Sequence, residues 1–181
     1  MVTIEVNETV FLKQILLSDA TELFATIDRE RRSLRKWLPF VDYTRGISDS
    51  EDFVRSLYEK GSREIVFVIN CQSRFAGLIG LKGIDHSNHR CEIGYWLSEK
   101  FRGRGVMTAA VRALVDYAFE DLDMNRIQIK CAVENVASSN IPRKTGFFLE
   151  GIERDGELLA DGQYVDLEVY SLVRRKDRIV T

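Results

Sequence analysis

The feature that most constrains this chain is a change of hydrophobic period between residues 90 and 120. Apolar side chains occupy every second position of residues 90–97, which is typical of a half-buried strand. In residues 106–120 they return at helical spacing instead. The short link between these segments contains Gly103 and Gly105. The sequence therefore predicts a strand, a tight turn and an amphipathic helix in direct succession.

A glycine-bearing turn that leads into a helix is suited to binding an anion. Glycine lets the main chain turn tightly and approach a ligand, and the N–H groups of the first helical turn lie at the positive end of the helix dipole. Arg102 and Arg104 add positive charge. The alternative is a solvated loop whose arginines face water. The loop has neither the Gly-Lys-Ser/Thr ending of a P-loop nor the third glycine of a dinucleotide fingerprint.

The other periodic segments predict a mixed sheet with helices. Helices are expected within residues 18–38, 48–60 and 137–144, and strands at 65–69, 75–81, 127–133, 148–154 and 164–172. This order predicts an α/β (α+β) fold with a mixed, mainly antiparallel sheet flanked by helices on both faces. The length predicts a single domain that spans residues 1–181.

Composition and charge argue against several classes of protein. Cys71, Cys91 and Cys131 are odd in number and widely spaced, which fits neither a disulfide framework nor paired zinc thiolates, and no metal is expected. A net charge of -2 gives no general attraction to nucleic acid, so no direct nucleic-acid partner is expected. Without a signal peptide or an apolar run of about 20 residues, a cytoplasmic protein with no membrane contact is predicted.

Residues 102–107 resemble the Arg/Gln-x-x-Gly-x-Gly/Ala motif of the GNAT acetyltransferases. Arg102 opens the motif, Gly105 is its glycine, and Met107 departs from the usual Gly or Ala in a way that is similar to the branch that modifies ribosomal proteins. The order of elements resembles this family over nearly the whole chain. The resemblance implies acetyl-CoA as co-substrate, with amides of residues 103–107 on its pyrophosphate. The implied cofactor-binding residues are Leu97, Arg102, Gly103, Arg104, Gly105, Val106, Met107 and Asn135.

A second similarity covers residues 134–147, where an Asn follows a strand and a helix ends in Gly-Phe. In this family the short helix often carries a catalytic Tyr, but Pro142 stands there. The resemblance to the ribosomal-protein branch implies Ser138 as the catalytic acid and Glu157 as the catalytic base through water. Asn135 and Ser138 have the alternative role of helix caps, and Glu157 that of a solvated hairpin carboxylate.

The acceptor is predicted to be the N-terminal α-amine of a protein, such as a ribosomal protein, which attacks the thioester directly. An α-amine has a pKa of about 8 and a lysine about 10.4, so a neutral lysine costs about 3 kcal/mol more at neutral pH. Trp37 is expected to line the acceptor groove, with a core position as the alternative. A small-amine acetyltransferase and a non-catalytic acetyl-CoA-binding module remain alternatives. A homodimer is left open.

Overall fold

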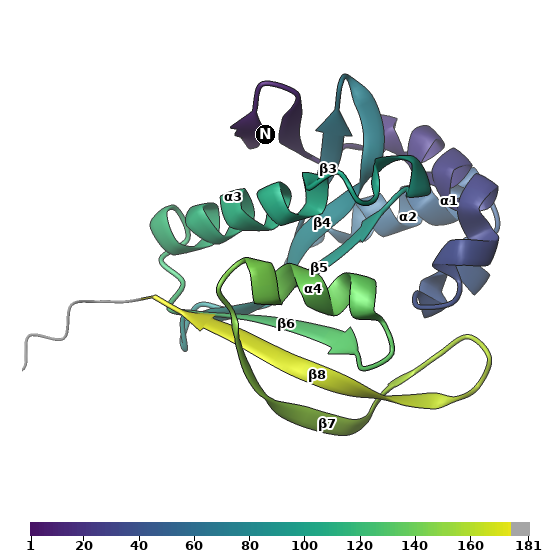
Figure 1. Cartoon of the computed structure of the whole chain (residues 1–181). Helices are drawn as coiled ribbons and strands as arrows, with labels where there is room; N and C mark the ends of the chain where they lie inside the picture. The colour runs from purple at the N-terminus through teal and green to yellow at the C-terminus, as the bar shows by residue number, and fades with distance from the viewer. Residues whose placement is uncertain (175–181) are drawn as a thin grey trace, which may run out of the picture.

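The structure, a computed structural model, describes residues 1–174 and is built on one eight-stranded sheet (Figure 1). The strand order is β1-β2-β3-β4-β5-β6-β8-β7. The strands are β1 (Thr3–Asn7), β2 (Val10–Gln14), β3 (Ile65–Cys71), β4 (Arg74–Asp85), β5 (Arg90–Leu97), β6 (Arg126–Ala132), β7 (Phe148–Leu158) and β8 (Tyr164–Val173). Among these strands of the described residues, only β5 and β6 pair in parallel, and the other neighbours are antiparallel. The predicted mixed, mainly antiparallel sheet is confirmed.

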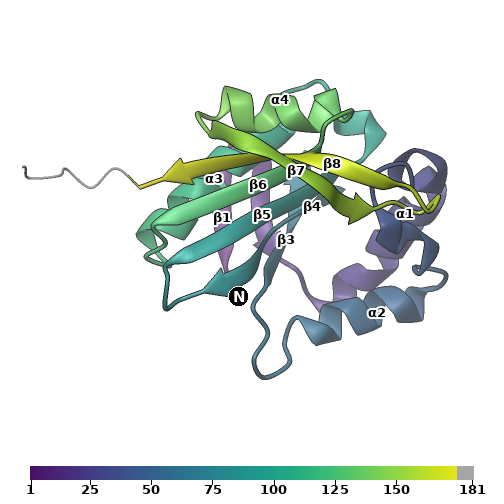
Figure 2. The same cartoon turned by 90° about the horizontal axis from the view of Figure 1, so that it is seen from below.

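Helices cover both faces of this sheet, as Figures 1 and 2 show. They are α1 (Ala20–Leu34), α2 (Ile47–Ser56), α3 (Val106–Glu120) and α4 (Val136–Lys144), with short 3-10 turns η1 (Leu17–Asp19), η2 (Pro39–Asp42) and η3 (Glu99–Phe101). Side chains of α1 and α2 pack on one face, and those of α3 pack on the opposite face. The predicted helix of residues 106–120 therefore sits where its apolar stripe meets the sheet.

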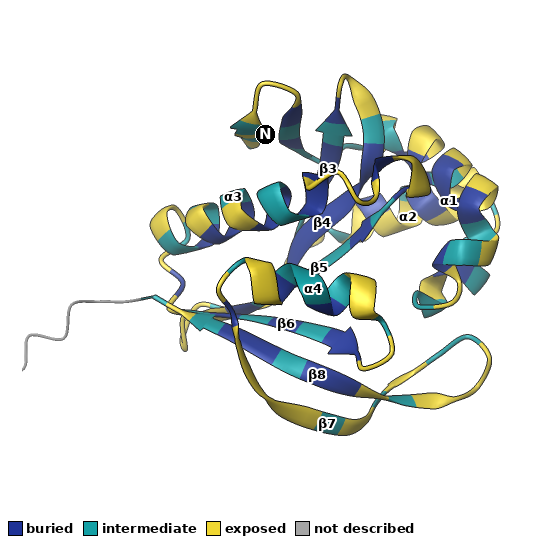
Figure 3. Ribbon diagram, in the orientation of Figure 1, coloured by how far each residue is buried: buried dark blue, intermediate teal, exposed yellow. Residues whose placement is uncertain are grey.

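Alternation within β5 divides its side chains between two cores. Ile93 packs with Leu114 of α3, and both are almost completely buried. Trp96 points the other way and packs with Leu23 and Ile27 of α1. Figure 3 shows that α3 is buried on one side and exposed on its outer side. Each fully buried aliphatic side chain contributes about 1.5–3 kcal/mol, so both helix layers are firmly held.

The structure differs from the sequence prediction at the N-terminus. β1 and β2 were not predicted, although Val10 and Leu12 are 3% and 0% exposed. Each strand has five residues, a length at which the hydrophobic pattern does not distinguish a strand from a helix. Pairing with β3, where Leu12 lies opposite Ile69, determines that β2 is a strand. β4 and β7 are also longer than predicted, and α2 ends earlier, at Ser56.

The three cysteines are free thiols and all are buried. Within residues 1–174, no group of three or more His, Cys, Asp or Glu side chains could hold a metal ion. No helix in this part of the chain is both long and apolar enough to cross a membrane.

Candidate active site

The site begins where β5 and β6 separate. The parallel pairing starts at Arg90 opposite Arg126 and ends at Glu92 opposite Gln128. β5 continues for five more residues, to Leu97, while still paired with β4 on its other side. The edge of β5 that faces β6 is therefore open over its last part. A cleft between two neighbouring strands of the sheet results.

The main chain of Leu97 faces this cleft. The N–H of Ser98 donates to the carbonyl of Ala76 at 2.8 Å, which makes Gly77 and Leu97 a non-hydrogen-bonded pair of the antiparallel ladder. At such a position the N–H and C=O groups point away from the paired strand. The carbonyl of Leu97 accepts from Nε of Arg102 at 3.0 Å. The N–H of Leu97 is thus the group that β5 offers to a ligand in the cleft.

The glycine turn lies directly beyond the end of β5. Gly103 and Gly105 have φ values of 73° and 76°, in the left-handed region that favours glycine, and Gly105 caps the N-terminus of α3. The first N–H groups of α3 have no partner within the helix, and they carry the positive end of its dipole. This loop is suited to hold the pyrophosphate of a nucleotide cofactor.

A cavity of about 240 Å³ adjoins this loop and the open edge of β5. It brings together most of the residues that the sequence singled out for cofactor binding. The cavity is lined by Ser33, Leu34, Trp37, Leu38, Tyr95, Trp96, Leu97, Arg102, Gly103, Met107, Asn135, Ala137, Ser138 and Ile141. We call it the cofactor cavity. Its walls come from the consecutive elements β5 and α3 and from α1 and α4, which lie farther away in the sequence.

Ser138 enters the cofactor cavity from the first turn of α4. The carbonyl oxygen of the Asn135 side chain accepts from the N–H of Ser138 at 3.2 Å, so Asn135 is a helix cap, and both residues also line the cavity. The hydroxyl of Ser138 lies 3.3 Å from the hydroxyl of Tyr95 and 3.3 Å from Sγ of Cys131. Burial raises the pKa of both Tyr95 and Cys131, which keeps these two groups protonated.

Tyr95 is a residue that the sequence did not identify as part of the site. Its hydroxyl donates to the carbonyl of Ser138 at 3.0 Å and so joins β5 to α4 across the cleft. In the sequence it was simply one of the alternating apolar positions of a strand. Its proximity to Ser138 arises only from the packing of α4 beside β5.

A second cavity, of about 460 Å³, lies on the α1 and α2 side of the sheet. Its floor contains Gly80 and Gly94, which face each other on β4 and β5, so no side chain fills the space between them. Aromatic and aliphatic side chains make up much of its wall, among them Leu23, Ile27, Phe40, Tyr43, Phe53 and Leu78. It shares Leu38, Tyr95 and Trp96 with the cofactor cavity. The two cavities therefore meet at the open end of β5.

Glu157, on the β7–β8 hairpin, lines this second cavity. The side chain keeps solvent exposure, but nearby protein atoms displace water from its carboxylate and raise its pKa. Lys82 opposes this rise and Glu92 adds to it. Lys82 and Glu92 form an ion pair with a separation of 2.9 Å. Glu157 is thus a carboxylate whose proton affinity is increased next to a cavity, as a general base requires.

The other predicted residues are distributed around the site. Trp37 lies on the wall of the cofactor cavity, outside the second cavity, and it is half-buried beneath Nζ of Lys36, which lies 4.6 Å from the ring centroid. The side chain of Arg104 lines a separate hollow near the β3–β4 turn. Val106 is 6% exposed, so only its main chain can meet a ligand.

Three comparisons relate this chain to known proteins. Residues 9–148 match the family described as "Acetyltransferase (GNAT) domain". YdaF of Bacillus subtilis (strain 168), provisionally named a ribosomal N-acetyltransferase, is 34% identical over 182 residues that cover 97% of each chain. The ribosomal-protein-serine acetyltransferase of Escherichia coli (strain K12) is 28% identical, covering 94% of this chain and 96% of its own.

Solved structures give the same result for the fold. The structure of RimL, the ribosomal L7/L12 alpha-N-protein acetyltransferase, in complex with coenzyme A superposes with a TM-score of 0.90. It is 29% identical, and the match covers 95% of this chain and 98% of that protein. The similarity thus extends over nearly the whole fold.

Proposed function

This chain belongs to the GNAT acetyltransferase family, and we propose that it transfers the acetyl group of acetyl-CoA to the N-terminal α-amine of a protein, a ribosomal protein in particular. The observation that carries this proposal is the meeting of two cavities at Tyr95. The cofactor cavity contains Ser138, and the second cavity contains Glu157. These positions support the inference that Ser138 acts as proton donor and Glu157 as proton acceptor from opposite sides of one junction. We call the second cavity the acceptor cavity.

The residues that line the cleft suit the binding of acetyl-CoA. Acetyl-CoA supplies a thioester whose carbonyl carbon the amine attacks and whose sulfur leaves as thiolate. The main-chain N–H groups of residues 103–107 would hold its pyrophosphate, with Arg102 at the cavity wall and Arg104, in the separate hollow, adding to the positive potential. Asn135 lies at the cavity wall, where its amide can reach the pantetheine arm. Met107 contributes an apolar wall to the same cavity.

The N–H of Leu97 is the donor that we assign to the carbonyl oxygen as negative charge develops there. It belongs to the fixed end of a strand, so little reorganisation is needed during reaction. Its orientation into the cleft follows from the register of β4 and β5. Removal of such a donor typically costs about 100-fold to 1000-fold in turnover.

Glu157 is the residue that we assign as general base. Its raised pKa makes it a better proton acceptor than an ordinary glutamate. A water molecule between the carboxylate and the amine would carry the proton. Loss of a general base typically lowers turnover about 100-fold to 10,000-fold.

Ser138 is the residue that we assign as proton donor to the leaving thiolate. Its hydroxyl lies in the cofactor cavity beside two other protonated groups, Tyr95 and Cys131. Neither neighbour carries a negative charge that would discourage a thiolate from forming nearby. Trp37, three residues beyond the end of α1, lines the same cavity.

The acceptor class follows from the strength of the base and from the relatives. A carboxylate acting through water suits an α-amine of pKa about 8 better than a lysine of pKa about 10.4. Two of the relatives carry names that refer to ribosomal proteins, and a third acetylates the α-amine of L7/L12 according to its name. An acceptor on ribosomal proteins would also suit a cytoplasmic protein, which we propose as its location.

The test is CoA release with acetyl-CoA and matched acceptors. Peptides that differ only in a free or a blocked N-terminus separate α-amines from lysine side chains, and spermidine represents small amines. Turnover that requires the free N-terminus supports the proposal. Turnover on spermidine alone would replace it with a small-amine acetyltransferase, and CoA binding without turnover on any acceptor would favour a binding module.

The roles of the two side chains are tested by substitution. Glu157→Gln should lower turnover about 100-fold or more while leaving the affinity for CoA unchanged. It should also remove the acidic limb of the pH–rate profile, which in the wild type is shifted upward from that of an ordinary glutamate because burial raises the pKa of Glu157. Glu153→Gln, on the same strand and outside both cavities, is the matched control. Unchanged turnover in Glu157→Gln would remove Glu157 from the mechanism.

A further inference from the structure

A buried carboxylate connects α1 to the start of the cofactor loop. Glu30 is 8% exposed. Its Oε1 accepts from the hydroxyl of Ser98 at 2.5 Å, and its Oε2 accepts from the N–H of Glu99 at 2.9 Å. Ser98 directly follows the last residue of β5, and Glu99 begins η3, which leads toward Gly103 and Gly105. The contact joins positions that are 68 residues apart in the chain.

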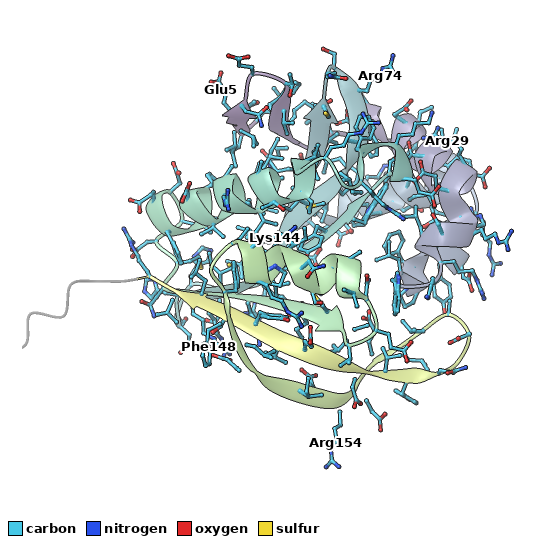
Figure 4. All side chains as sticks on the ribbon, in the orientation of Figure 1. Glu5, Arg29, Arg74, Lys144, Phe148 and Arg154 are labelled. Atoms are coloured by element: carbon cyan, nitrogen blue, oxygen red, sulfur yellow. The ribbon has the colours of Figure 1, made fainter. Side chains whose placement is uncertain are left out.

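Glu30 does not contribute to a regular helix. Its φ and ψ of -111° and 16° interrupt α1, which is kinked there. A buried charge is costly unless it is hydrogen-bonded, and the nearest cation, Arg29, is 47% exposed with Nη2 3.8 Å from Oε1. Figure 4 labels Arg29 on the outer side of α1. This weak ion pair offsets little of the cost, so the hydrogen bonds to Ser98 and Glu99 are the main stabilising contacts of the carboxylate.

Ser98 and Glu99, the residues that Glu30 contacts, lie between two groups that face the cofactor: the N–H of Leu97 and the glycine turn. The main chain of Ser98 is held on the other side by its N–H bond to Ala76, and its carbonyl accepts from the N–H of Phe101 at 3.0 Å. Leu97, which precedes Ser98, directs its N–H into the cleft. Arg102 and the glycine turn follow Glu99 along the chain. A displacement of Ser98 and Glu99 would move both the Leu97 N–H and the glycine turn.

α1 itself forms a wall of both cavities. Leu23 and Ile27 line the acceptor cavity, and Ser33 and Leu34 line the cofactor cavity. Glu30 lies between these two pairs along the helix. Its carboxylate therefore fixes the cofactor loop relative to the same helix that shapes the acceptor side.

We propose that Glu30 is a positioning residue, which holds the Leu97–Glu99 main chain against α1 so that the cleft is preorganised for acetyl-CoA. The inference rests on the cofactor site assigned above and adds a residue that touches neither cofactor nor acceptor. Preorganised donors contribute to binding because no ordering is left to occur when the ligand arrives. Loss of this contact should act on cofactor affinity before it acts on the acceptor.

The experiment compares Glu30→Met with Glu30→Gln in the full-length protein. Methionine has similar length but no acceptor atoms for Ser98 or Glu99. Glutamine keeps a carbonyl for the Glu99 N–H, and its amide can donate to the Ser98 hydroxyl, which can rotate to accept. Glu22→Met, at an exposed position of the same helix, is the control. The measurements are the CoA dissociation constant by calorimetry, the KM for each substrate and the melting temperature.

Glu30→Met should weaken CoA binding about tenfold, the equivalent of one strong hydrogen bond. Glu30→Gln should bind CoA with an affinity within about threefold of that of the wild type. The KM for the acceptor at saturating acetyl-CoA should be unchanged in both variants. Ser98→Ala removes a single bond, and it should weaken CoA binding by a smaller factor, which keeps the proposal testable if Glu30→Met fails to fold.

An unchanged CoA dissociation constant in Glu30→Met, or in Ser98→Ala where Glu30→Met fails to fold, would overturn the proposal. So would a loss of CoA affinity matched by an equal rise in acceptor KM and no rescue by glutamine, because that pattern indicates general destabilisation. The calorimetry uses CoA without an acceptor. A failure of the acceptor assignment would therefore leave this test intact.

Discussion

Substitution of Gly77 by alanine should show how closely β4 and β5 approach beside the cofactor cleft. A Cβ at Gly77 would lie 2.2 Å from the carbonyl oxygen of Trp96 and 3.0 Å from Cα of Leu97, both of them main-chain atoms. Ordinary contacts begin near 3.4 Å, so β5 would have to move by about 1 Å. Gly77 also has a φ of 154°, which an L side chain rarely adopts.

The magnitude follows from these two terms. Overpacking costs about 1–3 kcal/mol and an unfavourable φ about 1–3 kcal/mol, so Gly77→Ala should lower the free energy of unfolding by about 4 kcal/mol. For a chain of this size the melting temperature should fall by about 8–16 °C. CoA affinity should fall as well, because Leu97 lies directly opposite Gly77.

Gly83→Ala, on the same strand, is the matched control. Gly83 has a φ of 59°, but nothing lies within 4 Å of an added Cβ. Gly83→Ala should therefore lower the free energy of unfolding by about 1 kcal/mol, the cost of the unfavourable φ alone. Urea unfolding of both variants gives the comparison. If Gly77→Ala were destabilised no more than Gly83→Ala, the close approach of β4 and β5 at the cleft would be wrong.

Two further predictions concern the acceptor cavity and the sheet. Gly94→Val should raise the KM for the acceptor about tenfold and leave CoA binding unchanged, because an added Cβ meets only the flexible side chain of Lys82, at 3.7 Å, and the new methyl groups fill the cavity floor. An unaltered acceptor KM would show that the acceptor binds elsewhere. Glu150→Gln should cost about 1 kcal/mol or less at pH 7, since the bonds of 2.7 and 2.6 Å from Arg126 to Glu150 join partly exposed groups. Arg126 lowers the pKa of Glu150 to about 2, so its stabilising effect is present above the unfolded pKa of about 4.3 and is lost as the pH falls toward 2. Urea unfolding at pH 7 and at lower pH measures this, and a constant difference between the proteins would contradict it.

The central part of the fold and its cofactor loop were predictable from local patterns. The strand of residues 90–97, the glycine turn and the helix of residues 106–120 are each specified by residues close together in sequence, and their bounds agree with β5 and α3. Period and turn chemistry are local properties, so they can be read without the rest of the chain. The motif around Gly105 then gave the family, which the comparison of residues 9–148 confirms.

Features that depend on distant partners were not predictable. β2 is a strand because β3 pairs with it, and its five residues alone are ambiguous. Tyr95 reads as a core residue of a strand, yet packing of α4 brings its hydroxyl to Ser138. Glu30 reads as a polar position in a helix, and only the approach of α1 to the end of β5 turns it into a buried ligand of Ser98 and Glu99.

The sequence by itself therefore determined the order of most elements, the family and the loop for the cofactor. The tertiary structure decided that Ser138 and Glu157 line adjoining cavities, and that the main chain of Leu97 faces the cleft. The physical reason is that periodicity reports which side of an element is buried, whereas a site depends on which elements meet. That meeting is fixed by strand register and helix packing across the whole chain.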